Sequence, residues 1–131
     1  MVGGAQELIL DYGCFNTGIL IHEIMHTLGF FHEHSRPDRD EYLNIFLENV
    51  EETKKYNFVK LNASQYPYDV AEFPFDFKSI MIYGEDAFSK NSAPTMMPKE
   101  WVFGTRIKDP GTKTKLSSLN VQLIRSTYRC N

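Results

Sequence analysis

The amino-acid sequence predicts a single α+β unit over residues 1–131, with few regular elements and long loops. Three observations predict it: a short alternating stretch near the N-terminus, a largely apolar helical segment after it, and a helix with one apolar face at the C-terminus. The stretch between the helices contains many aromatic residues together with Gly, Pro and Ser, which is typical of loops. Because 42% of the residues are hydrophobic and 14% aromatic, the chain can form a core.

The first two predicted elements are a strand and a helix. Residues 5–12 alternate between polar and apolar side chains, which predicts an edge strand, and a turn is expected at Gly13. A helix is predicted over residues 17–28, with Asn16 as its N-cap. Apolar side chains surround this helix, so we expect it to be buried on most faces, with its histidines opening into a cleft. These apolar side chains are Ile19, Leu20, Ile21, Ile24, Met25 and Leu28.

The middle of the chain has weaker signals. An extended piece is expected at residues 42–47 and a weakly helical polar segment at 51–55, followed by aromatic-rich loops through Phe77. Residues 89–99 and 104–115 are rich in Gly, Pro, Ser and Lys, so we expect surface connections there.

The C-terminal helix has a clearer pattern. Either Ser117 or Ser118 can cap it. Val121, Ile124 and Tyr128 share one face of this helix, which is expected to run to Cys130.

All four histidines fall within residues 22–34, which read H-E-I-M-H-T-L-G-F-F-H-E-H. His22 and His26 stand four residues apart, so a helix projects both imidazoles from one face, close enough to reach one ion. Gly29 can take the left-handed conformation that ends a helix, which lets the chain bring His32 back as a third ligand. The spacing therefore predicts a zinc site with one Zn²⁺ per chain.

Three protein ligands leave one position of a tetrahedral zinc open, as in catalytic sites. Glu23 lies at the rim of the same helix face, and we expect it to act as a general base; a solvated helix carboxylate is the alternative. A lone histidine is more often structural, but chance produces this spacing with a probability of roughly 10⁻⁵. His34 lies outside the spacing, and we expect a surface or supporting position for it.

The residues that follow extend the motif. Residues 22–40 match the signature H-E-x-x-H-x-x-G-F-x-H-E-x-x-R-x-D-R-D throughout, so the chain resembles the astacin branch of the metzincin zinc endopeptidases. The residues after the third histidine separate astacins from the other metzincin branches. They are Glu33, Arg36, Asp38, Arg39 and Asp40.

A second segment, S-I-M-I-Y-G at residues 79–84, resembles the Met-turn of this family. The resemblance implies that Met81 forms a hydrophobic floor beneath the metal and that Tyr83 approaches the zinc. Without the family, both would be interpreted as core residues of a short apolar run. Ile82 stands where astacins usually have histidine; that position is not a ligand in the family, so we expect altered packing or subsite shape.

The resemblance implies zinc-dependent hydrolysis of a protein or peptide substrate. Zinc would polarise the scissile carbonyl while Glu23 takes a proton from the attacking water and passes it to the leaving amine. The hydroxyl of Tyr83 would stabilise the oxyanion. The alternative is a zinc-binding but inactive fragment or paralogue that binds peptides or proteins.

The resemblance covers the C-terminal two-thirds of a metzincin, or zincin-like, catalytic domain: edge strand, active-site helix, loop-rich lower sub-domain and C-terminal helix. We therefore expect a truncated domain without its N-terminal sheet sub-domain. The strand at residues 3–10 would lack its sheet neighbours, and Glu33 would lack the N-terminal group that it approaches in mature astacins. Such a fragment is expected to bind zinc, and its cleavage activity stays open.

Cys14 and Cys130 are the two cysteines of the chain. From the residues alone they could close one large loop or stay reduced. The resemblance instead implies that each pairs with a cysteine outside this chain, in a secreted parent protein. The sequon at Asn62, N-A-S, is compatible with secretion.

Charge and hydropathy exclude other classes of function. The net charge of −3 gives no footprint for nucleic acid, and no apolar run approaches a membrane span. The opening residues M-V-G-G-A-Q do not resemble a signal peptide, so we expect none in this chain. The sequence leaves the oligomeric state open.

Overall fold

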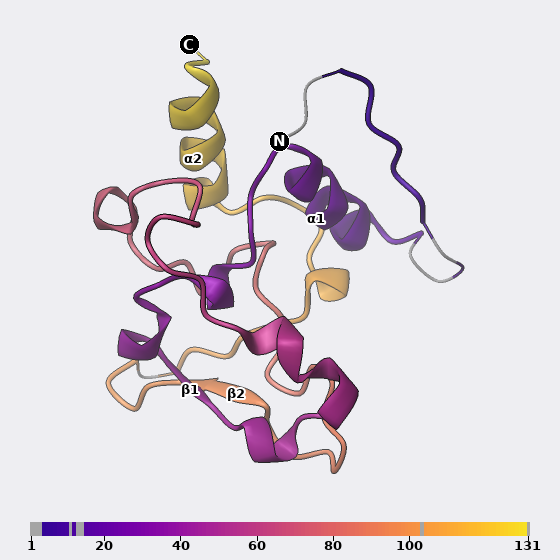
Figure 1. Ribbon diagram of the computed structural model, residues 1–131, viewed down its shortest axis with the longest axis vertical. Coiled ribbons are helices and arrows are strands. Elements are labelled where there is room, and N and C mark those ends of the chain that lie inside the picture. The colour runs from indigo at the N-terminus through magenta and orange to yellow at the C-terminus, as the bar shows by residue number, and fades with distance from the viewer. Residues whose placement is uncertain (1–3, 11, 13–14, 103, 131) are drawn as a thin grey trace.

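The computed structural model describes residues 4–10, 12, 15–102 and 104–130. Its regular elements are helix α1 (Thr17–Thr27), strand β1 (Leu43–Ile45), strand β2 (Met96–Pro98) and helix α2 (Ser118–Tyr128). Both helices lie at one end of the molecule and the strands at the other (Figure 1). This mixed architecture confirms the predicted α+β class. Short 3₁₀ helices lie at Glu33–Ser35, Arg39–Glu41, Leu47–Asn49, Glu52–Phe58, Val70–Glu72 and Pro110–Thr112.

Helix α1 begins as predicted. The side chain of Asn16 accepts hydrogen bonds from the backbone N–H groups of Gly18 and Ile19, at 2.9 and 3.2 Å, which confirms the N-cap. The same side chain donates to the carbonyl of Gly111 at 2.6 Å. Gly18 is needed here, because a Cβ would lie 2.0 Å from the carbonyl oxygen of Pro110. The first turn of α1 therefore rests directly on the Pro110–Thr112 segment.

The end of α1 turns the chain back toward the histidines. Gly29 has φ +90°, a conformation that L side chains rarely adopt. Its N–H donates to the carbonyl of His26 at 2.9 Å, and the N–H of Phe30 donates to the carbonyl of Met25 at 3.1 Å. These two bonds close the last turn and direct the chain to His32.

The prediction that α1 is buried on most faces is wrong. Only Gly18, His22 and Met25 are buried in this helix, and Ile24 is 48% exposed. One side of the helix packs against a core cluster formed by Met25, Phe30, Ile80, Met81 and Leu123, and its first turn packs against Pro110–Thr112. The other residues of α1 are partly buried, except Thr17 and Ile24, which are exposed.

The predicted edge strand at residues 5–12 is also wrong. Residues 5–10 have no strand conformation, and the side chain of Ile9 is 81% exposed. A strand needs a neighbour for its backbone N–H and C=O groups, and no described segment pairs with this one. One contact to α1 is a long hydrogen bond of 3.4 Å from Gln6 Nε2 to the carbonyl of Thr27.

The small sheet confirms one expectation and corrects another. The extended piece predicted at 42–47 contains β1, which pairs antiparallel with β2 in the register Leu43 to Pro98 and Ile45 to Met96. Because β2 lies within residues 89–99, the prediction of a simple surface connection there is wrong. The side chain of Met96 is fully buried, so a core contact overrides the loop-like composition of this segment. Met96 belongs to a second core cluster, together with Leu43, Phe75, Ile82 and Ile107.

Helix α2 has the predicted cap at Ser117, which forms a capping box with Asn120. The helix ends at Tyr128, two residues earlier than expected, because Arg129 takes a left-handed conformation. The hydroxyl of Tyr128 donates to the carbonyl of Leu28 at 2.7 Å and so ties α2 to the end of α1. No described helix is long and apolar enough to cross a membrane. Cys130 is an exposed free thiol, and Cys14 lies outside the described residues.

Candidate metal centre

The structure brings together the three histidines that the spacing selects. The Nε2 atom of His26 lies 3.1 Å from that of His22 and 3.1 Å from that of His32, and the His22 and His32 atoms are 3.2 Å apart. Three ligands of a tetrahedral zinc, with Zn–N bonds of about 2.0–2.1 Å, stand about 3.3–3.4 Å apart. The observed triangle therefore fits a zinc ion to within a few tenths of an ångström, and these residues could hold one.

Backbone carbonyls fix two of the rings. His22 Nδ1 lies 2.8 Å from the carbonyl oxygen of Ile80, and His26 Nδ1 lies 2.8 Å from that of Phe30. A carbonyl can only accept, so each Nδ1 carries the proton and each Nε2 presents a lone pair. Lone pairs that converge at 3.1–3.2 Å repel one another unless a cation lies between them. The orientation therefore supports the same conclusion as the spacing.

Burial keeps the imidazoles of His22 and His32 neutral, as metal binding requires. Burial is the main cause that lowers the pKa of His22. Burial, followed by the neighbouring histidines, lowers the pKa of His32 to about 2. Protons therefore compete weakly for these nitrogen atoms at neutral pH.

His34 packs against His32, the third histidine of the triangle. Its side chain is fully buried, so the expectation of a surface position is wrong and the supporting position is what the structure gives. Its ring stacks on His32 at 5.0 Å between centroids and lies 4.3 Å from the ring of Tyr83. Its Nε2 faces the carbonyl of Asn57 at 3.2 Å, while its buried Nδ1 has no hydrogen-bond partner in the described residues. Burial lowers its pKa to about 3.

Glu23 and Tyr83 line one cavity of about 270 Å³ beside His22, together with Phe88 and Asp109. The ring of Tyr83 lies 4.5 Å from that of His32. Burial, followed by the charge of Glu23, raises the pKa of Tyr83 to about 12, so its hydroxyl stays protonated and can donate a hydrogen bond. The cavity thus combines a carboxylate with a hydroxyl donor beside the histidine triangle.

Met81 and Glu33 connect the two motifs behind the histidines. The backbone N–H of Glu33 donates to the carbonyl of Met81 at 2.9 Å, which joins the segment after His32 to the turn at residues 79–82. The Met81 side chain is 2% exposed and lies in the core cluster that also contains Met25 of α1. Ile82 is fully buried in the second cluster, so its side chain serves packing.

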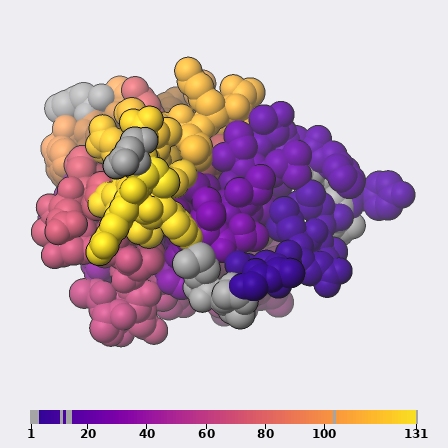
Figure 2. Space-filling model, turned by 90° about the horizontal axis from the view of Figure 1, so that it is seen from above, coloured from indigo at the N-terminus to yellow at the C-terminus, as the bar shows by residue number. Residues whose placement is uncertain are grey.

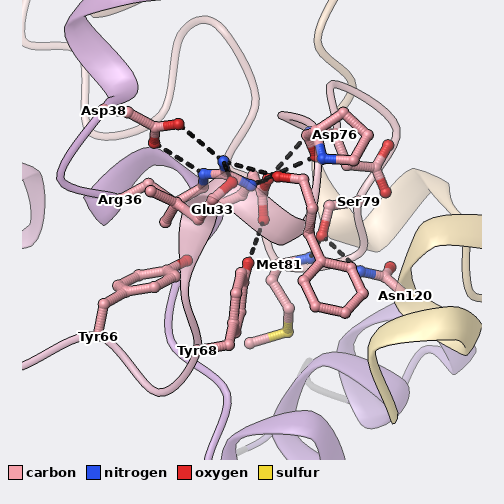
Figure 3. A network of polar contacts seen from close by, with 12 residues as sticks. Glu33, Arg36, Asp38, Tyr66, Tyr68, Asp76, Ser79, Met81 and Asn120 are labelled. Atoms are coloured by element: carbon pink, nitrogen blue, oxygen red, sulfur yellow. Dashed lines mark hydrogen bonds and ion pairs between the residues drawn. The ribbon is translucent and has the colours of Figure 1, made fainter. Parts of the chain in front are cut away.

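The carboxylate of Glu33 is buried and has partners within the chain (Figure 3). Its Oε1 accepts from the Asp76 backbone N–H at 2.9 Å and from Arg36 at 3.1 Å. The guanidinium of Arg36 also binds Asp38 through two bonds of 2.9 and 2.8 Å. Burial raises the pKa of Glu33 to about 7 although Arg36 opposes that shift. This buried ion pair fixes the chain just after His32.

Sequence reasoning did not select the groups that hold the histidine rings. The carbonyls of Phe30 and Ile80 carry no sequence signal. Asn120, which contacts the Ile80 peptide, had a weak one: it stands three residues after Ser117, the position at which a capping box has a polar side chain.

The chain matches one protein family over nearly its whole length. The family model described as Astacin, a peptidase family, matches residues 1–129. The chain is 39% identical to zinc metalloproteinase nas-14 of Caenorhabditis elegans, over 98% of this chain and 24% of that protein. It is 42% identical to astacin-like metalloprotease toxin 1 of Loxosceles intermedia, over 98% of this chain and 47% of that protein.

A solved structure is similar over most of the chain. It is that of high choriolytic enzyme 1, a hatching enzyme zinc-protease from the medaka fish Oryzias latipes, with a TM-score of 0.76 and 34% identity. The match covers 92% of this chain and 56% of that one. The chain thus spans less than two thirds of each of these relatives.

Proposed function

The chain belongs to the astacin family of peptidases, and from this premise we propose that it forms the metal-binding part of a zinc-dependent endopeptidase. His22, His26 and His32 are the proposed ligands of one zinc ion. The observation that carries the proposal is the triangle of Nε2 atoms, 3.1–3.2 Å apart, beside a cavity that Glu23 and Tyr83 line.

Each residue of the cavity has a proposed role in peptide hydrolysis. When bound, zinc supplies a Lewis acid that polarises the substrate carbonyl and acidifies water. Glu23 takes a proton from the attacking water and delivers it to the leaving amine. The protonated hydroxyl of Tyr83 donates a hydrogen bond to the oxyanion that develops on the substrate. Met81, Gly29 and Glu33 hold the surrounding backbone in place.

The test combines zinc content with chelator-sensitive cleavage of a denatured protein substrate. We expect one zinc per chain, and cleavage that stops when the metal is removed. Glu23→Gln should keep the zinc and abolish turnover, whereas Glu48→Gln, at an exposed glutamate, should change neither. Near-normal cleavage by zinc-loaded Glu23→Gln protein would remove Glu23 from the role of base.

The alternative function is a zinc-binding module that binds peptides or proteins without cleaving them. It is favoured by the exposed segment before α1, where Ile9 and Phe15 are 81% and 72% exposed. Zinc binding without cleavage by the wild-type chain would select this alternative.

We also propose that the parent protein is secreted and carries a glycan on Asn62. The sequon lies in an exposed turn, and the Ser64 hydroxyl donates to Asn62 Oδ1 at 2.7 Å, which leaves the amide nitrogen directed away from that bond. Expression through a eukaryotic secretory pathway, followed by enzymatic removal of N-glycans, should lower the mass of the wild-type protein and leave that of Ser64→Ala unchanged. An equal mass before and after treatment would contradict the glycan.

A further inference from the structure

The Ile80 carbonyl that binds His22 belongs to a turn whose polar groups are held by side chains. The backbone N–H of Ile80 donates to Asn120 Oδ1 at 2.9 Å. The other end of the same amide, Asn120 Nδ2, donates to the hydroxyl of Ser79 at 2.9 Å, and that hydroxyl also accepts from the N–H of Met81 at 3.0 Å. One side chain from α2 therefore holds the turn at two points.

These bonds are shielded from water. Asn120 is 3% exposed, Met81 is 2% exposed, and Ser79 and Ile80 are fully buried. A hydrogen bond lost in such surroundings leaves a buried donor without a partner, so the turn has a strong preference for the observed arrangement. The Ile80 carbonyl shares a peptide unit with the Met81 N–H, so this unit cannot rotate without breaking the bond to the Ser79 hydroxyl. The preceding unit, which carries the Ile80 N–H, cannot rotate without breaking the bond to Asn120.

Asn120 is itself fixed at the start of α2. Its backbone N–H donates to the Ser117 hydroxyl at 2.9 Å within the capping box. Lys113 Nζ donates to the carbonyl of Ser79 at 2.6 Å. The turn is thus bonded to residues of two segments that lie more than thirty residues further along the chain.

His22 and His26 differ in how the carbonyl groups that bind their rings are held in place. His26 is bound by the carbonyl of Phe30, whose N–H bonds to Met25 in the last turn of α1, so local backbone holds that ring. His22 is bound by the Ile80 carbonyl, and the N–H of the same peptide unit, that of Met81, donates to the Ser79 hydroxyl, which Asn120 also binds. The preceding peptide unit donates to Asn120 directly. In this metal centre, the carbonyl partner of one ring is thus held by bonds that lead to Asn120, and the partner of the other ring is held by local backbone.

We propose that Asn120 is a positioning residue of the metal centre, which fixes the ring of His22 through the two peptide units that flank Ile80 and so makes zinc affinity depend on helix α2. The inference rests on the proposed function, in which His22 is a zinc ligand. Groups that orient a metal-binding histidine typically change metal affinity by about 10–100-fold when they are removed. Asn120 acts one step further from the ring, so we expect the lower end of that range.

The main test compares three variants by competition for zinc with a chromophoric chelator. Asn120→Ala should weaken zinc binding by about tenfold. Asn120→Asp should restore most of it, because a carboxylate still accepts from Ile80 N–H and the Ser79 hydroxyl can turn to donate to it. Asn49→Ala is the matched control: its amide also bonds at both ends, to Pro94 and Asn91, but outside this network, and zinc affinity should not change.

A second readout does not depend on zinc. The ring Nδ1–H protons of His22 and His26, each bonded to a carbonyl, should give separate downfield NMR signals in the metal-free protein. In Asn120→Ala the His22 signal should shift and exchange faster with water, while the His26 signal stays in place. If Asn120→Ala does not fold, Ser79→Ala removes the middle link and should produce the same selective change.

Three results would overturn the inference: unchanged zinc affinity in the variants, an unchanged His22 signal, or equal changes in both ring signals. The last would indicate general loosening instead of positioning. Failure of the wild-type chain to bind zinc is a different outcome, because it would contradict the proposed function itself.

Discussion

The segments on the two sides of α1 are held in different ways. Before it, the described residues form neither helix nor strand, and Ile9, Tyr12 and Phe15 are 81%, 98% and 72% exposed. After it, Arg36 is 1% exposed and Ile82 is fully buried. Figure 1 shows the earlier segment, in dark indigo, as a long loop beside α1, and Figure 2 shows it from above along one margin of the molecule.

This difference shows which of the two segments contributes to the candidate metal centre. The carbonyls that orient His22 and His26 belong to Ile80 and Phe30, and the ring that backs His32 belongs to His34, so the metal centre is built from α1 and the chain after it. The earlier segment contributes the long bond from Gln6 to Thr27. Zinc binding should therefore be sensitive to changes after α1 and tolerate changes before it.

The largest effect is expected at Arg36, whose guanidinium is buried between Glu33 and Asp38. Arg36→Ala leaves a buried carboxylate without its main cation, which typically costs about 3–5 kcal/mol. Arg106→Ala is the control, because that side chain is 87% exposed and stands 3.8 Å from Glu85; its effect should be about 0–1 kcal/mol. Denaturant unfolding of both variants measures the difference. If both variants lose the same free energy of unfolding, burial is not what makes the Arg36 ion pair important.

A variant of Tyr83 tests its proposed catalytic role. Tyr83→Phe keeps the ring beside His32 and removes only the hydroxyl, so kcat should fall by about 10²–10³ with a smaller change in KM. Phe15→Leu, at a side chain before α1 that is 72% exposed, should leave both parameters unchanged. Steady-state kinetics on the active zinc protein gives the answer, and an unchanged kcat in Tyr83→Phe would show that Tyr83 only packs.

The sequence could predict those features that local geometry determines. The spacing of His22 and His26 on a helix, the left-handed Gly29 and the Asn16 and Ser117 caps each depend on residues close in sequence, and the structure confirms this geometry. The family resemblance, now supported by the match to residues 1–129, selected Tyr83, which lies beside the histidines.

The features that were predicted wrongly, or not at all, depend on partners distant in the sequence. The strand expected at residues 5–12 needs a neighbouring strand, and its alternating pattern says nothing about whether one is present. Strand β2 was hidden in a loop-like composition because its pairing with β1 and the burial of Met96 come from elsewhere in the chain. Likewise, the partner of His22 is a backbone carbonyl 58 residues away, which no side-chain pattern records.

Low pH should lower the folding stability of the metal-free protein, because the histidines that follow the exposed segment are buried in the folded state. The folded-state pKa values of His22, His32 and His34 lie below the unfolded value of about 6.5. As the pH falls below that value, the unfolded chain takes up protons that the folded chain does not, so stability is present above about pH 6.5 and is lost below it. After chelation, each of these three rings should lower the unfolding free energy by about 1 kcal/mol per pH unit between pH 6.5 and 5, while Glu33, whose folded-state pKa is raised to about 7, offsets about one of the three contributions. A flat profile would contradict the neutral, buried state of these rings.

The smallest effect is expected before α1, and it uses one residue type in two places. Ile9→Ala removes atoms that are 81% exposed, so the free energy of unfolding should change by less than about 0.5 kcal/mol. Ile82→Ala removes the same atoms from a fully buried site among Leu43, Phe75 and Met96, where about 2–5 kcal/mol should be lost. Zinc affinity should be unchanged in Ile9→Ala. If Ile9→Ala instead lowers stability as much as Ile82→Ala, the earlier segment packs against the rest of the chain in solution, and the contrast between the two sides of α1 does not hold.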